Sequence, residues 1–330
     1  MDDGEDDVNV FMKDPFVTEV LTKSLSISLC TPELWTQSHS DRIGVIILWK
    51  SGIGKETAVD LARRGARVIL ACRNPKLAEE AVREIQKRSN NMNVVYRYLD
   101  LANLKSVRTF ATEFLEEEQR LDILINNAGS AIGFVLNKPP QQTYDGFELN
   151  FGINHFGHFL LTLLLLERLK KCSPSRIVVV SSDSHAFVKS AMDFTQNSPD
   201  GLRYPGLCGY PISKAATILF ASELARRLKS TGVTVYSVHP GWVYTNIMVK
   251  EGHPLHFFLR PWFWLFLLSE RTGAQCSIHC AVDETITDLS GSYFENCQPH
   301  PVRSWVAQDD VMCKKLWEVS CQAVGIEYNG

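Results

Sequence analysis

The chain lacks a surplus of positive charge. Its 34 lysines and arginines are outnumbered by 37 aspartates and glutamates, and the formal net charge is -3. Proteins that bind nucleic acid or an anionic membrane surface through electrostatics present a basic face, and no dense run of lysine and arginine supplies one. We therefore expect no nucleic-acid partner, and we favour a small molecule as the ligand.

The chain also lacks a recognisable N-terminal leader. Residues 1–7 are mostly acidic where a secretory signal would be basic, and no apolar run of about 18 residues follows them. Residues 1–40 show little periodicity, so we expect a loosely ordered extension there. No N-terminal membrane anchor is visible.

The cysteines lack paired spacing. Their number is nine, which is odd, and they are scattered along the chain. This pattern favours free thiols in a reducing compartment over a disulfide framework. Cys276, His279 and Cys280 would share one face of a helix and could in principle hold a metal. No second ligand pair accompanies them and buried thiols are common, so we predict no metal site.

What the chain does have is an alternation of apolar runs and helical patterns from residue 43 onward. Strands are expected at residues 43–48, 67–71, 93–99, 121–125, 176–180, 233–238 and 292–294, and helices at 57–64, 76–88 and 104–117. The Val/Ile/Leu runs are continuous, which is typical of parallel strands covered on both faces. The predicted fold class is α/β, a doubly wound parallel sheet of the Rossmann type.

A chain of 330 residues with 45% hydrophobic content can bury a large core. No repeat, low-complexity tract or Pro/Ser-rich linker divides it. We therefore predict one domain at residues 41–300, followed by a helical segment at 301–330. An apolar segment at 248–269 is expected to form a lid within the domain.

Candidate catalytic groups stand in Tyr210-Pro211-Ile212-Ser213-Lys214, downstream of Ser182. A hydroxyl donor, a nearby cation and a second hydroxyl suit carbonyl/alcohol redox chemistry. Hydride delivered to a carbonyl creates an alkoxide, which must receive a proton as it forms. Tyr210 is the candidate acid/base. Its ordinary pKa is about 10, and we expect the Lys214 cation to lower it by favouring the phenolate.

A glycine-rich turn, Ser51-Gly52-Ile53-Gly54, follows the first expected strand and opens a helix. Glycines there let backbone N–H groups and a helix N-terminus approach the phosphates of a dinucleotide. A Gly-x-Gly alone is a weak signal. Its place between a strand and a helix is the context that supports a phosphate site.

Residues at the ends of later strands extend the predicted cofactor site. Arg73 follows the second strand, where no acidic residue stands to bind a ribose 2′-hydroxyl. It could instead meet a 2′-phosphate, which favours NADP(H) over NAD(H), although it could also be a solvated strand-end residue. Asp100 and Leu101 are candidate adenine-side contacts, and Asn127-Ala128-Gly129 allows the cofactor close passage.

The chain resembles the short-chain dehydrogenase/reductase family in the identity and the order of its motifs. In chain order these are Gly52-Ile53-Gly54, Asp100, Asn126-Asn127-Ala128-Gly129, Asn154, Ser182, Tyr210/Lys214 and His239-Pro240-Gly241. The chain is most similar to its retinol dehydrogenase-like branch over about residues 50–300. Local phrases such as Leu61-Ala62-Arg63-Arg64-Gly65-Ala66-Arg67 strengthen that likeness. The resemblance implies an NADP(H)-dependent oxidoreductase for a lipophilic alcohol or carbonyl, of the retinol/retinal kind.

The resemblance also implies roles for single residues. Ser182 would orient the substrate oxygen, Lys214 would bind the nicotinamide ribose, and Asn154 would position a water linking Lys214 to solvent. The alternative for Asn154 is a polar side chain turned to water. The segment that would close over the nicotinamide contains Pro240, Gly241, Val243 and Thr245. The family often pairs through helices like those carrying Asn154 and Tyr210, so a homodimer is expected.

The glycine-rich turn departs from the family pattern. A threonine and a glycine are expected where this chain has Ile47 and Leu48. Leu48 and Trp49 bring bulk and restrict the backbone where a tight turn approaches the pyrophosphate. A clash of a few kcal/mol would weaken cofactor binding by orders of magnitude, since about 1.4 kcal/mol is tenfold. The alternative function is therefore a catalytically impaired scaffold that keeps the fold.

Residues 254–268 hold several aromatic side chains interrupted by Arg260. The segment is too short and too charged to span a bilayer, and too apolar for an exposed loop. In the family this position is the substrate-side lid, which favours a lipophilic substrate or shallow membrane contact over plain core packing. We expect an intracellular protein, cytoplasmic or associated with the endoplasmic-reticulum membrane.

Overall fold

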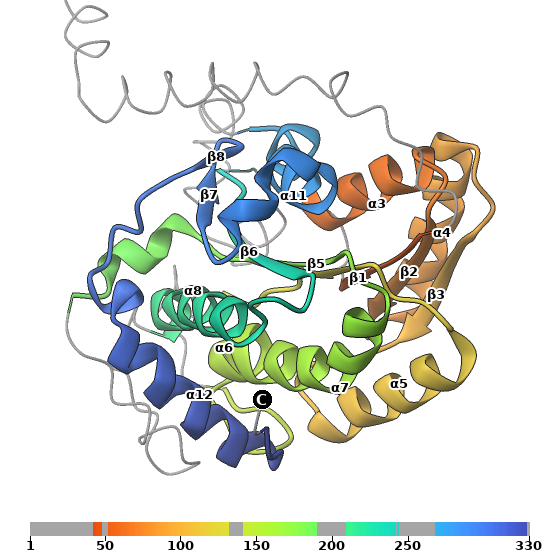
Figure 1. Ribbon diagram of the computed structural model, residues 1–330. Helices are drawn as coiled ribbons and strands as arrows, with labels where there is room; N and C mark the ends of the chain where they lie inside the picture. The colour runs from red at the N-terminus through yellow and green to blue at the C-terminus, as the bar shows by residue number, and fades with distance from the viewer. Residues whose placement is uncertain are drawn as a thin grey trace, which may run out of the picture.

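The structure is a computed structural model that describes residues 42–47, 52–131, 141–189, 209–241, 243 and 268–328. These residues form an eight-stranded sheet in the order β3-β2-β1-β4-β5-β6-β7-β8 (Figure 1). The strands are β1 (Ile43–Ile47), β2 (Arg67–Cys72), β3 (Val94–Tyr98), β4 (Ile123–Asn126), β5 (Ser175–Val180), β6 (Val233–His239), β7 (Tyr293–Glu295) and β8 (Gln298–Pro299). Neighbouring strands are parallel except β7 and β8, which are antiparallel. The predicted doubly wound parallel sheet is confirmed.

Helices cover both faces of the sheet (Figure 1). One layer contains α3 (Ile53–Arg63), α4 (Pro75–Ser89) and α11 (Glu270–Val282). The other contains α5 (Leu104–Glu117), α6 (Leu149–Phe151), α7 (His158–Lys171) and α8 (Gly209–Arg227), with α12 (Asp310–Val324) packed against α8. Short 3-10 helices lie at η3 (Asp183–Phe187), η5 (Glu284–Leu289) and η6 (Val306–Gln308).

The continuous apolar pattern of the strands has a direct structural reason. In β2, Val68 and Leu70 pack into the hydrophobic core beneath α3, α4 and α11. Ile69 and Ala71 point to the opposite face and pack into the core beneath α5, α7 and α8. Both faces of the strand are therefore buried, so neither set of alternating positions is polar.

Helix boundaries follow local capping chemistry. The predicted helix at 104–117 is confirmed at both ends, and the Asn103 side chain caps it by accepting hydrogen bonds from the N–H groups of Lys105 and Ser106 at 3.0 and 3.3 Å. The helix expected at 57–64 begins earlier, at Ile53. Gly52 stands at its N-cap with φ 100°, a conformation that favours glycine.

A helix that runs from Leu149 to Lys171 through α6, the π-helical turn η2 (Gly152–Gly157) and α7 crosses the core. Among the described residues it is the one helix long and apolar enough to span a membrane. However, 89% of its most apolar window is buried inside the protein. That burial is typical of a core helix.

Several predictions cannot be compared with the fold. The N-terminal extension at 1–40 and nearly all of the lid at 248–269 lie outside the described residues. The limits of the predicted domain remain a prediction. Within the segment at 301–330, the helix is α12.

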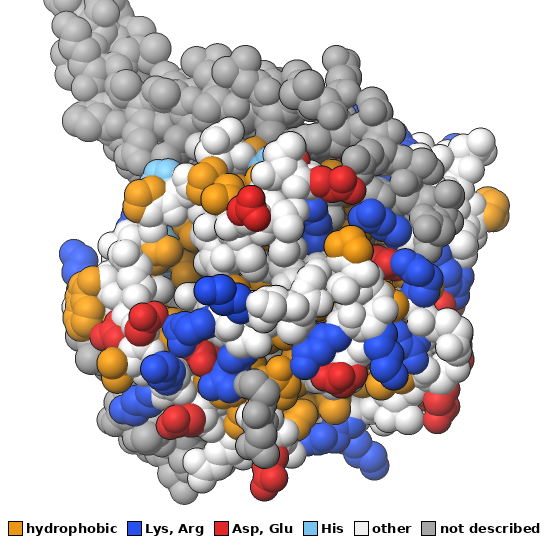
Figure 2. Space-filling view, in the orientation of Figure 1, with side chains coloured by type: hydrophobic (Ala, Val, Ile, Leu, Met, Phe, Trp, Pro, Cys, Tyr) orange, Lys and Arg blue, Asp and Glu red, His pale blue; other side chains and the backbone are white. Residues whose placement is uncertain are grey.

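On the face displayed in Figure 2, basic side chains are interspersed with acidic ones. Six of the described cysteines are free thiols, including Cys276 and Cys280, and the part of the chain that is described holds no metal-ligating cluster. The expectation of free thiols is wrong for Cys297, which is disulfide-bonded.

Candidate active site

The structure brings Tyr210 and Ser182 together at the carboxyl end of β5. Ser182 follows that strand and is the N-cap of η3, where its hydroxyl accepts a hydrogen bond from the N–H of Ser184 at 3.2 Å. Tyr210 lies in the first turn of α8, and its phenol is hydrogen-bonded to the Ser182 side chain. Pro211 in the same turn is tolerated, as proline generally is at the start of a helix.

Lys214 lies one helical turn after Tyr210 and is only 4% exposed. Its Nζ donates to the carbonyl oxygen of Val180 at 2.8 Å and lies 5.8 Å from the centroid of the Tyr210 ring. Burial lowers the pKa of Lys214 from its ordinary value of 10.5 to about 8. The ammonium is therefore held at the end of β5 by a backbone carbonyl, close to the point of deprotonation near neutral pH.

The predicted lowering of the Tyr210 pKa is wrong for the structure as it stands. Burial raises the pKa of Tyr210, and the hydrogen bond from Ser182 opposes that rise without reversing it. Lys214 is not among the causes of this shift, which are burial first and the Ser182 hydrogen bond second. Burial favours the neutral form of a phenol.

Asn154 joins two parts of the site. Its Oδ1 accepts from the N–H of Ser130 at 2.7 Å, and its Nδ2 donates to the Ser130 carbonyl at 2.9 Å and to Ser213 Oγ at 2.8 Å. Ser213 Oγ in turn donates to the carbonyl of Tyr210 at 2.7 Å. At 1% exposure Asn154 is not turned to water, so that alternative is excluded. Its side chain ties the loop after β4 to the helix of Tyr210.

Asn154 lies in the π-helical turn η2. Such turns are rare and often found at functional sites, because they release backbone groups from the regular ladder. The carbonyl of Asn154 is paired with His158 Nδ1 at 3.1 Å. Gly157 lets this turn pack closely, since a Cβ there would lie 2.7 Å from the carbonyl oxygen of Leu101.

Gly129 lies against the catalytic group of residues. A Cβ at Gly129 would be 3.5 Å from both Asn154 Oδ1 and Lys214 Nζ. Ala128 beside it is buried, and the N–H of Asn127 bonds to the carbonyl of Ile125. The end of β4 therefore places Gly129 directly beside the lysine and the asparagine. That a cofactor passes this segment stays a prediction.

The first turn of α3 forms the candidate phosphate end. The N–H groups of Lys55 and Glu56 bond to the carbonyl of Gly52, and the N–H groups of Ile53 and Gly54, earlier in the turn, have no intrahelical acceptor by geometry. A helix N-terminus of this kind suits an anion. Ser51, Leu48 and Trp49 lie outside the described residues.

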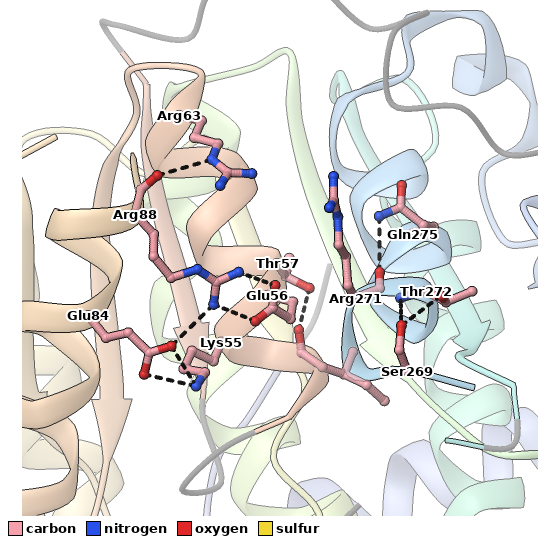
Figure 3. Close-up of polar contacts among 11 residues, drawn as sticks. Lys55, Glu56, Thr57, Arg63, Glu84, Arg88, Ser269, Arg271, Thr272 and Gln275 are labelled. Atoms are coloured by element: carbon pink, nitrogen blue, oxygen red, sulfur yellow. Dashed lines mark hydrogen bonds and ion pairs between the residues drawn. The ribbon is translucent and has the colours of Figure 1, made fainter. Parts of the chain in front are cut away.

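Charged side chains surround this turn (Figure 3). Lys55 Nζ donates to both oxygens of Glu84 at 2.9 and 3.0 Å, and Arg88 binds Glu56 through two bonds of 2.6 Å. These pairs brace α3 against α4. On the other side, Glu270 Oε1 lies 3.6 Å from where a Cβ on Gly52 would be, and burial raises the pKa of this carboxyl. The sequence analysis missed Glu270, which adjoins the turn only in three dimensions.

The segment predicted to close over the nicotinamide is described in part. Gly241 has φ 83°, and a Cβ on Gly273 of α11 would lie 2.3 Å from Val243 and 3.3 Å from both Ile53 and the carbonyl of Pro240. Glycine at position 273 is thus needed for the contact between α3, α11 and this segment. Thr245 lies outside the described residues.

The remaining predicted cofactor residues lie at strand ends on the same edge of the sheet. Arg73 is exposed immediately after β2. Asp100 is buried, and its Oδ1 accepts from the N–H of Ala102 at 3.0 Å. Leu101 is buried beside Gly157. Ser213 and Ser130 were missed by sequence reasoning, although Ser213 falls within the Tyr210–Lys214 motif.

A doubly wound parallel sheet, a glycine-rich turn at its first helix and a serine–tyrosine–lysine group at the carboxyl ends of its strands define a dinucleotide-dependent oxidoreductase. The profile described as enoyl-(acyl carrier protein) reductase matches residues 47–256. Mouse (Mus musculus) retinol dehydrogenase 11 is 44% identical over 310 residues, covering 94% of each chain. The chain belongs to the short-chain dehydrogenase/reductase family.

Further similarities agree with this placement. Human (Homo sapiens) retinol dehydrogenase 12 is 46% identical over 290 residues, with 87% of each chain covered. A crystal structure of an uncharacterised protein from Mycobacterium paratuberculosis has a TM-score of 0.69 and 34% identity, covering 89% of this chain and 97% of that one. The retinol dehydrogenase-like branch suggested by the sequence is therefore confirmed.

Proposed function

We propose that the protein is an NADP(H)-dependent oxidoreductase that exchanges a hydride between nicotinamide and a lipophilic alcohol or carbonyl of the retinol/retinal kind. The observation that carries this proposal is the hydrogen bond between the Tyr210 and Ser182 side chains, with Lys214 buried beside the Tyr210 ring. A structural role alone would not require two hydroxyls and a buried cation at the carboxyl edge of the sheet.

The residues divide the proton chemistry between them. The bound cofactor supplies or accepts the hydride at the substrate carbon. Ser182 donates a hydrogen bond to the substrate oxygen, and Tyr210 gives that oxygen its proton during reduction or takes it during oxidation. Lys214, whose pKa is lowered to about 8, would bind the nicotinamide ribose and place a cation near the Tyr210 ring. Asn154 holds Ser213 and the start of α8 in register with the loop of Ser130.

The raised pKa of Tyr210 favours one direction. A phenol that stays protonated at neutral pH is a competent acid, whereas oxidation of an alcohol requires the phenolate as base. At neutral pH the tyrosine is therefore in the protonated form that carbonyl reduction requires. Alcohol oxidation should need a higher pH, where the phenolate is populated.

The choice of NADP(H) rests on Arg73. It is exposed at the end of β2, and no acidic side chain follows that strand to bind a ribose 2′-hydroxyl. A guanidinium pairs well with a 2′-phosphate. The described residues fit a dinucleotide: a positive-φ glycine caps α3, and Gly129 keeps space beside Lys214.

The substrate class rests on the relatives and on the apolar lid. The relatives are named as retinol dehydrogenases, and residues 254–268 are rich in aromatic side chains. This segment, which lies outside the described residues, would cover a lipophilic substrate and make shallow contact with an intracellular membrane such as the endoplasmic reticulum. The homodimer expected through the helices of Asn154 and Tyr210 stays a prediction, and both helices are largely buried within this chain.

A second candidate function is a catalytically impaired scaffold with weakened cofactor binding. Leu48 stands where the family pattern has the first glycine of the turn. The Glu270 carboxylate beside Gly52 adds negative charge where a pyrophosphate would bind. Either feature weakens anion binding without disturbing the catalytic residues.

Titration of the purified protein with NADPH and NADH separates the two candidates. A ligand that binds only the folded form raises the melting temperature. We expect a larger shift with NADPH than with NADH, and NADPH-dependent consumption of all-trans-retinal. If neither nucleotide shifts the melting temperature at millimolar concentration, the oxidoreductase proposal is wrong and the scaffold remains. Binding without turnover of retinal or other lipophilic carbonyls would reject the substrate class alone.

A further inference from the structure

The short helix that Ser182 caps is fastened by a distant part of the chain. We call residues 303–305 the strap. Three successive hydrogen bonds join the strap to η3 and the residues after it: Arg303 N–H to His185 Nε2 at 3.1 Å, Ser304 Oγ to the Val188 carbonyl at 2.6 Å, and Trp305 Nε1 to the Lys189 carbonyl at 3.2 Å. A segment more than a hundred residues away thus holds the turn that begins with Ser182.

His185 connects the strap to Ser182 itself. It is fully buried, and its Nδ1 lies 2.7 Å from the carbonyl oxygen of Ser182. Because the backbone N–H of Arg303 can only donate, Nε2 must carry the lone pair, which places the proton of the neutral ring on Nδ1. His185 therefore donates to Ser182 and accepts from Arg303, and both ring nitrogens are used.

The Arg303 side chain makes a second connection. Its guanidinium pairs with Asp183, the residue after Ser182, and with Glu295 of β7 at 3.1 Å. Glu295 is only 2% exposed, so this carboxylate needs a partner. The N–H of Asp183 also bonds to Nδ1 of His239, which precedes the Pro240-Gly241 segment. The ion pairs of Arg303 fix the Ser182 turn against the end of β7, and the hydrogen bond to His239 fixes it against the end of β6.

We propose that His185 and Arg303 are positioning residues for Ser182: together they fix the backbone from which the Ser182 hydroxyl reaches Tyr210 and the substrate oxygen. This rests on the proposed function, in which Ser182 orients the substrate. The contacts described for both residues are with the Ser182 turn and with β7. Their loss should lower turnover while leaving nucleotide binding intact.

The arrangement also predicts a response to acid. The charged and titratable groups around the His185 ring are Asp183, Glu295 and Arg303, and the Tyr293 ring packs edge-on at 5.2 Å. Protonating Nε2 would place two donors against each other at the Arg303 N–H. Burial lowers the pKa of His185, so the neutral ring persists to pH values below its ordinary range. Turnover should fall as pH drops through that lowered pKa.

The chain offers a matched control for Arg303. Arg67 and Arg303 have side chains that are equally exposed, at 28%, and each pairs with a buried carboxylate, Glu118 at 8% and Glu295 at 2%. Arg67 begins β2, at the opposite end of the parallel strands from Ser182. Arg303→Met and Arg67→Met each remove an ion pair to a buried carboxylate, in different places, and Arg303→Met also removes the pair with Asp183.

The experiment compares these variants with the parent in NADPH-dependent reduction of all-trans-retinal, in the NADPH-induced thermal shift, and in hydrogen exchange of residues 183–189. For Arg303→Met we expect kcat to fall by at least about 10-fold, the thermal shift to be kept, and these amides to exchange faster. Arg67→Met should change none of the three, and Arg303→Lys should recover part of the lost kcat. Equal losses of kcat in both methionine variants would overturn the proposal.

His185 supplies an independent test. Glutamine at position 185 keeps a donor and an acceptor but does not titrate, so His185→Gln should keep more activity than His185→Phe and should lose the acid limb of the kcat profile. An unchanged acid limb would contradict the role of His185. If the parent itself shows no turnover, the proposed function fails and exchange alone decides: faster exchange in Arg303→Met supports the strap, and unchanged exchange overturns it.

Discussion

The catalytic end of the site and the phosphate end differ in how well they suit a dinucleotide enzyme. At the catalytic end, Asn154, Ser182, Tyr210 and Lys214 are connected to one another or to nearby backbone by hydrogen bonds. At the phosphate end, the helix N-terminus at Gly52 is present, but Lys55 is paired with a carboxylate and Glu270 lies beside the turn. Leu48 departs from the family pattern there as well.

This difference indicates that cofactor binding, rather than proton transfer, determines whether the protein is active. Burial disfavours the charged form of Lys214, so the buried ammonium lowers the stability of the folded chain even though a carbonyl holds it. A group kept at such a cost to stability is expected to have a function. The intact catalytic end supports the proposal that the cofactor binds. The phosphate end sets how tightly it does so, and experiments on the two ends should give separable results.

The largest expected effect is at the catalytic end. Tyr210→Phe removes the proton donor while keeping the ring and its contacts, so kcat for retinal reduction should fall by about 10² to 10⁴-fold. The NADPH-induced thermal shift should be unchanged, because the phosphate end is not altered. Retained turnover in this variant would show that another group transfers the proton.

At the phosphate end, restoring the family residue should strengthen binding. Leu48→Gly returns backbone freedom and removes bulk, and we expect the dissociation constant for NADPH to fall by about 10-fold to 100-fold. Leu48→Ala separates the two causes, since it removes bulk but leaves the backbone restricted. If neither variant binds more tightly in a calorimetric titration, Leu48 is compatible with the turn and the scaffold alternative loses its main support.

The fold and most of the catalytic end were predictable from the sequence, and the reason is local. Continuous apolar runs in β2 and β5 indicate strands that are buried on both faces. The Asn103 side chain caps α5 and so indicates where this helix begins. Tyr210, Ser213 and Lys214 lie within one helical turn, so their spacing alone places them together.

What the sequence could not supply are contacts between distant segments and effects of burial. Glu270 reaches Gly52 from α11, and Arg303 reaches Asp183 from beyond β8. Neither contact has a sequence signature. The pKa of Tyr210 was predicted with the wrong sign because desolvation depends on the packed surroundings, which a motif does not report.

Burial of the catalytic cation should be measurable as lost stability. The pKa of Lys214 is lowered from 10.5 to about 8, so between these values the unfolded chain binds more protons than the folded one. The stability of the parent therefore rises with pH across this window, and the full penalty applies below about pH 8. Lys214→Met should stabilise the nucleotide-free protein at pH 7 by on the order of 1 to 3 kcal/mol.

Denaturant unfolding at several pH values checks this prediction. The gain for Lys214→Met should shrink as pH rises toward 10.5, while the exposed Lys105 of α5, changed to methionine, should have little effect at any pH. The same Lys214 variant should lose turnover. A destabilised Lys214→Met protein at pH 7 would mean that the bond to the Val180 carbonyl outweighs the cost of burying the charge.

The smallest expected effect is on NADPH affinity, when a negative charge is removed at the phosphate end. Glu270→Gln keeps the shape of the side chain but removes a negative charge beside Gly52, so NADPH should bind about twofold to fivefold more tightly at low salt and less so at high salt. Burial raises the pKa of Glu270, so the difference from the parent should narrow as pH falls and the parent's carboxyl becomes protonated. Glu116→Gln on the exposed end of α5 removes the same charge far from the turn. Equal gains in the two glutamine variants would assign the effect to net charge. The phosphate end would then differ from the catalytic end through Leu48 and the pairing of Lys55.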